Sequence, residues 1–326
     1  MVIRLYITFF IILLILAFLF PLSSKEKTAE ITFREGETIS KFSRKLREHG
    51  IIRFEKPFNL LFKIFGVEKN IRSGIYKLVY NEGEILTFIR IVSQKPKPFK
   101  IKITIYEGMN SFEIAKMLSQ KLKINYEKFI SLVNDSAFIE YLSRKHNRLK
   151  NLKSLEGFLF PDTYIFSESE EEKFIIEKLV DNFFDKIEKI DSLFNITNLS
   201  FYDVIKLASI IEKEAYYEEE KPTIASVFLN RLRINMPLQA NPTIAYVLKT
   251  NSYWLSEEEI KFNSPYNTYI NLGLPPTPIC SPSLSSIIAV LKPKKTDYLY
   301  FVANKDKKHL FAKTYSEHLK NIKKVR

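Results

Sequence analysis

The sequence predicts an α+β fold in which an N-terminal transmembrane helix precedes a small α/β module and a larger mixed α+β domain. Hydrophobic residues make up 46% of the 326-residue chain, which is enough to build a substantial core. An apolar run of 18 residues lies near the N-terminus. Beyond it, segments with alternating apolar residues and segments with helical spacing follow one another without a regular βαβ period, which indicates the α+β class.

Residues 5–22 predict an uncleaved membrane anchor. Thr8 is the only clearly polar residue in this run, and backbone groups in lipid must be satisfied within the segment, so the run would span as a helix. The alternative is a cleaved signal peptide, whose apolar region has about 7–15 residues and is followed by small residues. Because the run is longer and ends in Phe-Pro-Leu, we assign residues 1–24 to a cytoplasmic tip and the anchor.

Residues 31–52 and 103–124 form an internal repeat with an offset of 72 residues. Each copy begins with alternating apolar residues, which predict a strand, and continues with apolar residues at helical spacing. Gly36 and Gly108 separate the two parts. The polar residues that could cap the following helices are Thr38 or Ser40 in the first copy and Asn110 or Ser111 in the second.

The segment between the two copies completes a small module. Residues 74–80 predict a strand, residues 85–92 predict a short helix, and the proline-containing segment 94–98 is typical of a linker. We therefore assign residues 25–98 to a small domain. Residues 99–154 would form the second copy of the repeat, followed by a helical connector.

The rest of the chain, residues 155–326, is assigned to the largest domain. Its predicted helices cover residues 172–190, 201–220 and 283–291, and a basic helix closes the chain. Its predicted strands cover residues 298–304 and 309–313, with a strand or loop at 155–166 and a proline-rich turn at 273–282.

Composition excludes several classes of protein and of site. Eight glycines and 14 prolines exclude a collagen-like or low-complexity chain. The single cysteine, Cys280, excludes an internal disulfide framework, and the four histidines lack metal-ligand spacing, so we expect no metal and no cofactor. The net charge of +13 favours an anionic partner, either nucleic acid or a membrane or cell-wall surface.

The segment 201–220 places a carboxylate on an apolar helical face. At about 100° per residue, Glu212 lies about 80° from Val204, inside the arc of apolar side chains. Burial in such an arc would raise the pKa of Glu212, which suits a general acid near neutral pH. Glu214 lies near the other edge of the arc and does not share this face. The alternative is a helix-edge glutamate that pairs with lysine or arginine.

Two later segments carry polar side chains that suit sugar recognition. Amides hydrogen-bond hydroxyl groups in defined directions, and tyrosine rings stack on pyranose faces. These side chains are Asn230, Arg231, Gln239, Asn241 and Thr243 in the first segment and Tyr266, Asn267, Thr268 and Tyr269 in the second. The alternative is that they only close turns and cap helices.

Five segments together resemble the endolytic murein transglycosylases, the YceG-like family. They are LEGFLFPDTY (155–164), ASIIEKEA (208–215), VFLNRLRINMPLQANPT (227–243), YNTYINLGLPPTPICSP (266–282) and YLYFVANKDKKHLFAKTYSEH (298–318). They occur in the family's order and spacing, and the anchor and the N-terminal module also fit. The resemblance implies a single-pass membrane protein with a LysM-like small domain and a catalytic domain that faces the cell wall.

The resemblance also implies a reaction. The family cleaves the bond between N-acetylmuramic acid and N-acetylglucosamine in nascent glycan strands and forms a 1,6-anhydro ring, which would terminate strand elongation. The family's catalytic glutamate matches Glu212, which would act as acid and then as base. Because the nucleophile belongs to the substrate, a second carboxylate is not obligatory. The candidate substrate-binding residues in these motifs are Glu156, Gln239, Asn241, Thr243, Asn267 and Tyr269.

The chain departs from the family pattern at a few positions. Asn241 stands where the family commonly has aspartate, and Thr277 where glycine is commoner. The sequence Ser281-Pro282-Ser283 replaces a usual Asn-Pro-Gly. If the usual aspartate tunes the charge of the site, Asn241 alters that tuning, whereas asparagine serves equally well as a turn residue.

The implied partners and location follow from the same resemblance. We expect peptidoglycan glycan strands as substrate, penicillin-binding peptidoglycan synthases as partners, and an inner-membrane location with a cytoplasmic N-terminus and a periplasmic or extracytoplasmic catalytic domain. Nucleic acid is not an expected partner, because the bulk of the chain would be exported. The alternative function is a non-catalytic glycan-binding scaffold anchored in the membrane.

Overall fold

The computed structural model describes residues 27–80, 82–250 and 255–325. The predicted anchor at residues 5–22 lies outside the described residues. Within the described ranges, no helix is both long enough and apolar enough to cross a membrane.

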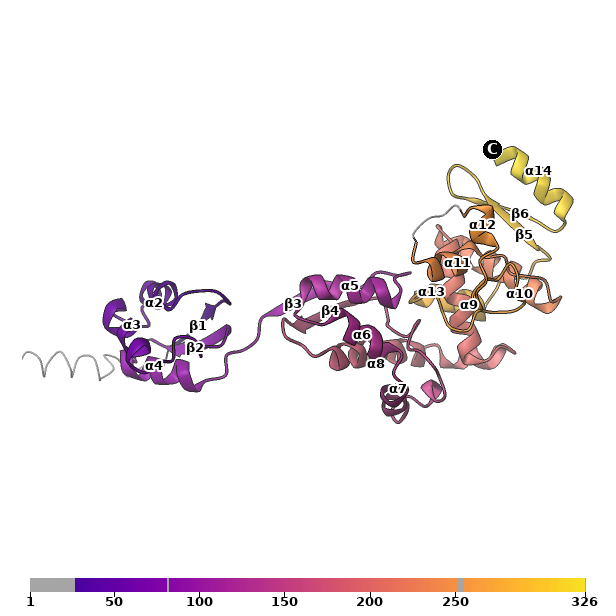
Figure 1. The fold of residues 1–326 in the computed structure, drawn as a ribbon. Helices are drawn as coiled ribbons and strands as arrows, with labels where there is room; N and C mark the ends of the chain where they lie inside the picture. Colours follow the sequence, from indigo (N-terminus) through magenta and orange to yellow (C-terminus); the bar gives the residue numbers. More distant parts are fainter. Residues whose placement is uncertain (1–26, 81, 251–254, 326) are drawn as a thin grey trace, which may run out of the picture. The chain divides into compact units, whose positions relative to one another are not determined.

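The chain divides into two compact units, the first ending at Lys100 and the second beginning at Ile101 (Figure 1). Each unit combines helices with short two-stranded sheets, so the predicted α+β class is confirmed. The predicted end of the small domain at residue 98 lies close to this division.

In the described part of the first unit, residues 27–80 and 82–100, a two-stranded antiparallel sheet packs with three helices. Strand β1 (Thr28–Phe33) pairs with β2 (Gly74–Val79) along its whole length. The helices are α2 (Ile39–Glu48), α3 (Glu55–Ile64) and α4 (Glu84–Ser93). The unit has a hydrophobic core of its own, to which every one of these elements contributes. Its fully buried aromatic and leucine side chains are Phe42, Leu46, Phe58, Phe62, Tyr76 and Leu78.

The second unit begins with the other copy of the repeat. Strand β3 (Lys100–Thr104) leads through Gly108 into helix α5 (Ser111–Lys121). Gly36 and Gly108 have matching φ angles of 74° and 76°, a left-handed region that glycine adopts without strain. The strand–glycine–helix pattern predicted for both copies is therefore confirmed.

Polar side chains start both repeat helices as predicted. The Thr38 side chain accepts the N–H of Lys41 at the start of α2. At the start of α5, Asn110 and Glu113 form a reciprocal capping box. Each cap satisfies a backbone N–H that lacks a partner within its helix.

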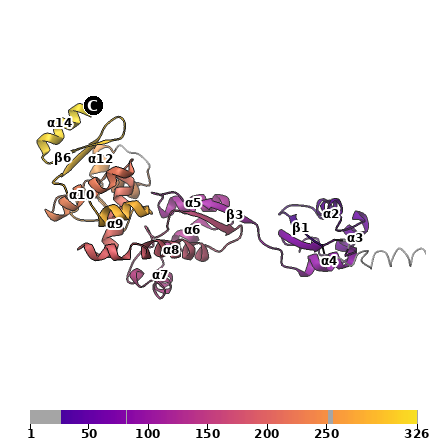
Figure 2. The same ribbon diagram turned by 180° about the vertical axis from the view of Figure 1, so that it is seen from behind.

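The remaining elements of the second unit are mostly helices. The longer helices are α6 (Tyr126–Val133), α7 (Ser136–Ser143), α8 (Glu172–Glu188), α9 (Phe201–Glu214), α10 (Lys221–Arg233), α11 (Asn241–Leu248), α13 (Leu284–Leu291) and α14 (Tyr315–Val325). The short elements are η1 (Asn147–Leu149), η2 (Asp191–Ile196), η3 (Glu218–Glu220) and α12 (Glu257–Ile260). Strand β4 (Thr163–Ser167) pairs with β3, and β5 (Tyr300–Ala303) pairs antiparallel with β6 (His309–Ala312). Helix α14 packs on β5 and β6, and the three lie together in both views (Figures 1 and 2).

Helix α9 forms the centre of the second unit. It packs against α10, α11 and α13, and its middle residues from Val204 to Ile211 include seven buried positions. Such a helix has little solvent-facing surface, so its direction is fixed by packing. Its C-terminal end is therefore a rigid platform for the residues that it carries.

One core runs through the whole second unit, from Ile103 to Leu291. It includes Phe129 and Leu142 from the predicted connector as well as Ile211 from α9. The boundary predicted at residue 154 therefore does not separate two cores. The apolar periodicity predicted the helices on both sides of this point, but not that they pack together.

Helix α9 ends at Glu214, six residues before the predicted end. Ala215 is extended, with φ −82° and ψ 124°, and α10 then starts with Lys221. Pro222 lies in the first turn of α10, because proline has no N–H to donate to a preceding turn. Pro222 is therefore compatible with the start of a new helix, and the acidic residues before it form the turn η3.

Candidate active site

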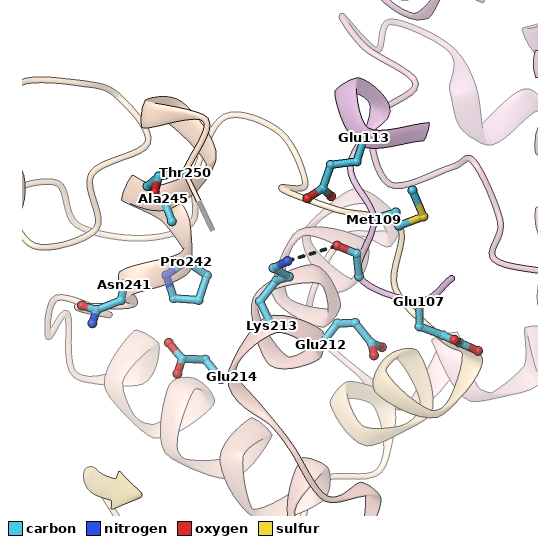
Figure 3. Close-up of a pocket in the computed structure, with 11 residues that line it drawn as sticks. Glu107, Met109, Glu113, Glu212, Lys213, Glu214, Asn241, Pro242, Ala245 and Thr250 are labelled. Atoms are coloured by element: carbon cyan, nitrogen blue, oxygen red, sulfur yellow. Dashed lines mark hydrogen bonds between the residues drawn. The ribbon is translucent and has the colours of Figure 1, made fainter. Parts of the chain in front are cut away.

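A pocket of about 410 Å³ opens beside the C-terminal end of α9 (Figure 3). Its volume lies within the range of about 300–1,000 Å³ that is usual for small-molecule sites. Its lining residues come from three segments: Glu107, Gly108, Met109 and Glu113 around the start of α5, Glu212, Lys213 and Glu214 on α9, and Asn241, Pro242, Ala245 and Thr250 in and after α11.

Glu212 is enclosed at this pocket, with a side chain only 9% exposed. One carboxylate oxygen, Oε2, accepts the backbone N–H of Ser283 at 2.8 Å and the hydroxyls of Ser283 at 2.5 Å and Ser286 at 2.7 Å. All three donors come from the first turn of α13 or its cap. Hydrogen bonds to a carboxylate are stronger than neutral ones, so these donors fix the orientation of Glu212.

Lys221 lies beneath the carboxylate. Its Nζ atom is 3.4 Å from Oε1 of Glu212 and 2.5 Å from Glu218, and its side chain is 3% exposed. The pairing of Glu212 with a lysine, which was the alternative interpretation from the sequence, is therefore present. Because Glu212 also lines the pocket, the pairing and a catalytic role do not exclude each other.

The surroundings of Glu212 correct the sequence prediction. The helical arc correctly predicted burial, but it also predicted apolar surroundings. The structure instead surrounds the carboxylate with Ser283, Ser286 and Lys221. Helical periodicity relates only the side chains of α9 to one another, whereas these three donors belong to α10 and to the start of α13.

The second repeat copy forms the wall next to Glu212. Lys213 Nζ donates to the carbonyl oxygen of Gly108 at 3.3 Å, the bond drawn in Figure 3. The Gly108 N–H donates to the carbonyl of Ser281 at 3.0 Å. A Cβ atom at Gly108 would lie 3.7 Å from Cγ of Glu212, in van der Waals contact. The turn after β3 is thus tied to α9 at the candidate catalytic residue.

Glu214 belongs to the same pocket, although the sequence placed it away from Glu212. In Figure 3 it points toward Asn241, while Glu212 lies on the other side of Lys213. Burial raises the pKa of Glu214 to about 7, and the positive charge of Arg231 opposes the rise. One helical turn therefore presents two carboxyl groups with different surroundings.

Asn241 and Tyr269 are two predicted site residues that the structure brings together. Asn241 lines the pocket, and the Tyr269 hydroxyl donates to its Oδ1 atom at 2.5 Å. Burial raises the pKa of the Tyr269 hydroxyl, and the nearby Glu214 carboxylate adds to that effect. This side of the pocket therefore carries an amide, a phenol and a carboxyl group in one cluster.

Glu156 is buried and ties two walls of the pocket together. It accepts the backbone N–H of Ser111 at 3.1 Å and its hydroxyl at 2.6 Å, and the Tyr246 hydroxyl at 3.1 Å. Ser111 begins α5 and Tyr246 lies on α11. Burial raises the pKa of Glu156, against these hydrogen bonds. The structure therefore gives Glu156 a supporting position behind the pocket.

Two further candidates, Asn267 and Thr243, make hydrogen bonds to backbone groups. The Asn267 amide donates to the carbonyls of Ile260 and Phe262 and accepts the Tyr269 N–H. The Thr243 hydroxyl is fully buried and donates to the carbonyl of Ala240. These contacts match the loop-closing alternative, which amides and hydroxyls fit equally well.

Gln239 is exposed and has a φ angle of 50°. Its backbone N–H donates to the carbonyl of Thr268 at 3.0 Å. Its side chain lies on the surface next to the loop that carries Tyr269.

The sequence interpretation missed six residues that surround the two α9 carboxylates. They are Glu107, Met109, Glu113, Lys213, Lys221 and Ser286. The repeat contained a signal for the first of them, because Glu107-Gly108 matches Glu35-Gly36. That match indicated only a turn, and nothing in it showed that one of the two turns lies against α9.

Comparison with known proteins gives a consistent result. The profile of the YceG-like family matches residues 31–324. The endolytic murein transglycosylase of Bacillus subtilis is 32% identical over 311 residues, which cover 92% of this chain and 86% of that protein. The protein of the same name from Streptococcus pneumoniae R6 is 31% identical, and the match spans 92% of this chain and 59% of that protein.

A solved structure agrees with these matches. The 2.6 Å crystal structure of a YceG-like protein from Listeria monocytogenes superposes with a TM-score of 0.63 at 31% identity. The superposition covers 91% of this chain and 100% of the other. From the family profile and the relatives, we conclude that this chain belongs to the YceG-like family.

Proposed function

We propose that this chain is a peptidoglycan lytic transglycosylase that cleaves glycan strands internally, at the bond between N-acetylmuramic acid and N-acetylglucosamine. The observation that carries the proposal is the enclosed Glu212 carboxylate, which lines a pocket and is held by three donors. The relatives named endolytic murein transglycosylase, which match 92% of the chain, supply the substrate class.

In the proposed reaction, the protonated Glu212 donates its proton to the glycosidic oxygen. The bond between that oxygen and C1 of the muramyl sugar breaks, and positive charge develops on C1. The C6 hydroxyl of the same sugar then attacks C1 and closes the 1,6-anhydro ring. Its proton passes to Glu212, which returns to the protonated form.

The surroundings of Glu212 support its second role best. The Ser283 and Ser286 donors and the Lys221 ammonium group all stabilise the carboxylate that exists after the first proton transfer. That carboxylate faces the positive charge on C1 and is already oriented to accept the C6 proton. Preorganised groups of this kind stabilise a transition state without reorganisation during the reaction.

The wider proposal concerns location and partners. Residues 5–22 would anchor the chain by a single pass in the inner membrane, with a cytoplasmic N-terminus and an extracytoplasmic catalytic unit. Residues 25–98 would form a LysM-like domain, and penicillin-binding synthases would be partners whose strands the protein terminates. The apolar sequence of the run and the extracytoplasmic position of peptidoglycan support this arrangement.

The decisive experiment is product analysis with a fragment of residues 25–326 and its Glu212→Gln variant. We expect the fragment to release 1,6-anhydromuramyl ends from uncrosslinked strands, detected by mass spectrometry. The variant should lose about 10²–10⁴-fold in rate, because glutamine cannot transfer the proton. Lys221 keeps Glu218 as a partner in this variant, so its fold should be retained.

Glu219→Gln is the matched control, because it makes the same change at an exposed position on the following turn. Reducing ends in place of anhydro ends would identify a hydrolase and refute the mechanism. Glycan binding without any product, equal in both proteins, would identify a binding scaffold.

A further inference from the structure

The first unit exposes a row of large apolar side chains on each of two neighbouring helices. Together they form what we call the α3–α4 face: Leu60, Ile64, Phe65, Leu86, Ile89 and Val92. Ile64 is 67% exposed and Ile89 is 52% exposed. Single exposed apolar residues are common on soluble proteins, but a cluster of this kind marks a surface that contacts another protein or a membrane.

The two rows lie on helices that are in contact with each other. Leu60 and Ile64 are four residues apart on α3, and the three residues of α4 are three apart, so each row occupies one side of its helix. The rings of Phe65 and Phe88 are 5.4 Å apart, and this contact joins the end of α3 to the middle of α4. The opposite sides of both helices fill the core.

The charge of this unit indicates the nature of the partner. Residues 27–100 contain sixteen lysines and arginines and eight acidic residues, a net charge of +8 out of +13 for the whole chain. Lys56 and Lys63 lie exposed on α3 itself. An apolar face with surrounding positive charge fits the boundary of an anionic lipid bilayer, where apolar side chains enter the interface and lysines contact the headgroups.

The position of the apolar run supplies the third argument. The run ends at residue 22 and β1 begins at Thr28, and the chain between them can span at most about 20 Å. Whatever surface holds the run is therefore within reach of the first unit. A membrane that holds residues 5–22 would face this unit at all times.

We propose that the α3–α4 face docks on the anionic surface of the membrane that holds residues 5–22. The inference rests on the anchor included in the proposed function. Docking by the face would give the first unit a fixed orientation on the bilayer, in addition to the covalent tether. The apolar row would enter the headgroup region, and Lys56 and Lys63 would contact phosphate groups.

The test uses the full chain in vesicles of phosphatidylcholine with phosphatidylglycerol. Ile64→Cys and Ile89→Cys each receive an environment-sensitive fluorophore, since the native Cys280 is buried. Lys77→Cys is the control, because this exposed residue lies between the buried Tyr76 and Leu78 of β2 and so points away from the core. We expect lipid-borne quenchers to quench the two face positions roughly tenfold more than the control, since interfacial side chains enter by about 5–10 Å.

The outcomes separate the inference from the anchor. Release of the chain from vesicles by alkaline extraction would refute the anchor itself. Retention of the chain with water-like signals at both face positions would refute the docking and leave the anchor standing. The fluorophores could instead become shielded from water to a degree that increases with the number of protein molecules per vesicle, without being quenched by the lipid-borne quenchers. That result would show that a second copy of the chain covers the α3–α4 face, and it would refute membrane docking. Loss of the quenching in vesicles of pure phosphatidylcholine would confirm that docking requires anionic headgroups.

Discussion

Glu212 and Glu214 show how two carboxyl groups on one helical turn acquire different properties. Glu212 accepts hydrogen bonds from Ser283 and Ser286 and lies within 3.4 Å of the Lys221 ammonium group. For Glu214, partial burial raises the pKa to about 7, and the positive charge of Arg231 opposes the rise. The pocket therefore presents two carboxyl groups that have different surroundings.

The raised pKa of Glu214 predicts a pH-dependent stability. Between its unfolded value of 4.5 and about 7, the folded protein keeps a proton that the unfolded chain has lost, so the free energy of unfolding falls as pH rises through this window. The fall should be about 1–3 kcal/mol. Glu214→Gln should remove it, measured by urea unfolding at pH 5 and pH 8. An unchanged slope in the variant would contradict the prediction, and Glu219→Gln serves as control.

At the scale of residues, the sequence predicted that the Glu212 side chain is buried on α9, but it did not predict the residues that surround it. Helical periodicity identified Glu212 because the pattern depends on α9 alone. Ser283 and Lys221 lie on other elements, and no local pattern relates them to Glu212. Periodicity gives only the angle of each side chain around the helix axis, and by that angle Glu214 lies on a different face from Glu212. At the end of a helix, however, side chains from different faces can line the same pocket.

At the scale of elements, the repeat shows that one local pattern can have two uses. The first copy pairs its strand with β2 and ends in a turn with open space around Gly36. The second copy pairs its strand with β4 and places Gly108 against Glu212 and Lys213. Strand, turn and helix were predictable in both copies because they depend on local sequence. Their partners were not, because strand pairing joins distant residues.

The two glycines offer a matched pair of substitutions. Gly36→Ala and Gly108→Ala should each lower the free energy of unfolding by about 1–2 kcal/mol, because both φ angles lie in the left-handed region. Only Gly108→Ala should also lower the transglycosylase rate, since its turn is bonded to Lys213 beside Glu212. Unfolding curves and product formation measure the two effects. An equal loss of rate in both variants would contradict the assignment of this wall.

At the scale of the molecule, each unit has its own hydrophobic core. We therefore expect two unfolding transitions in calorimetry. Phe42→Ala, in the first core, should lower one transition by about 3–5 kcal/mol and leave product formation unchanged at 25 °C. Phe183→Ala, which is equally buried in the second core, should lower the other transition and product formation together. A single transition that shifts in both variants would show that the units unfold as one.

The division of the chain into units was predictable only in part. The linker signal near residue 98 lies close to the observed division, because proline and lysine there interrupt both kinds of periodicity. The predicted boundary at residue 154 lies between the helical connector and the strand or loop predicted at residues 155–166. A core that is shared between the helices on either side cannot be predicted from the local sequence. The apolar face of an amphipathic helix shows that the helix is packed against something, but not against which element.

The wall that the second repeat contributes has a practical consequence for trimming the protein. A cut at residue 155 would keep Glu212, the α13 donors and α11, and would discard Gly108 and Glu113 with one side of the pocket. It would also remove Ser111, whose hydroxyl donates a hydrogen bond to Glu156. A fragment intended for activity measurements should therefore start at Ile101, where the second unit begins.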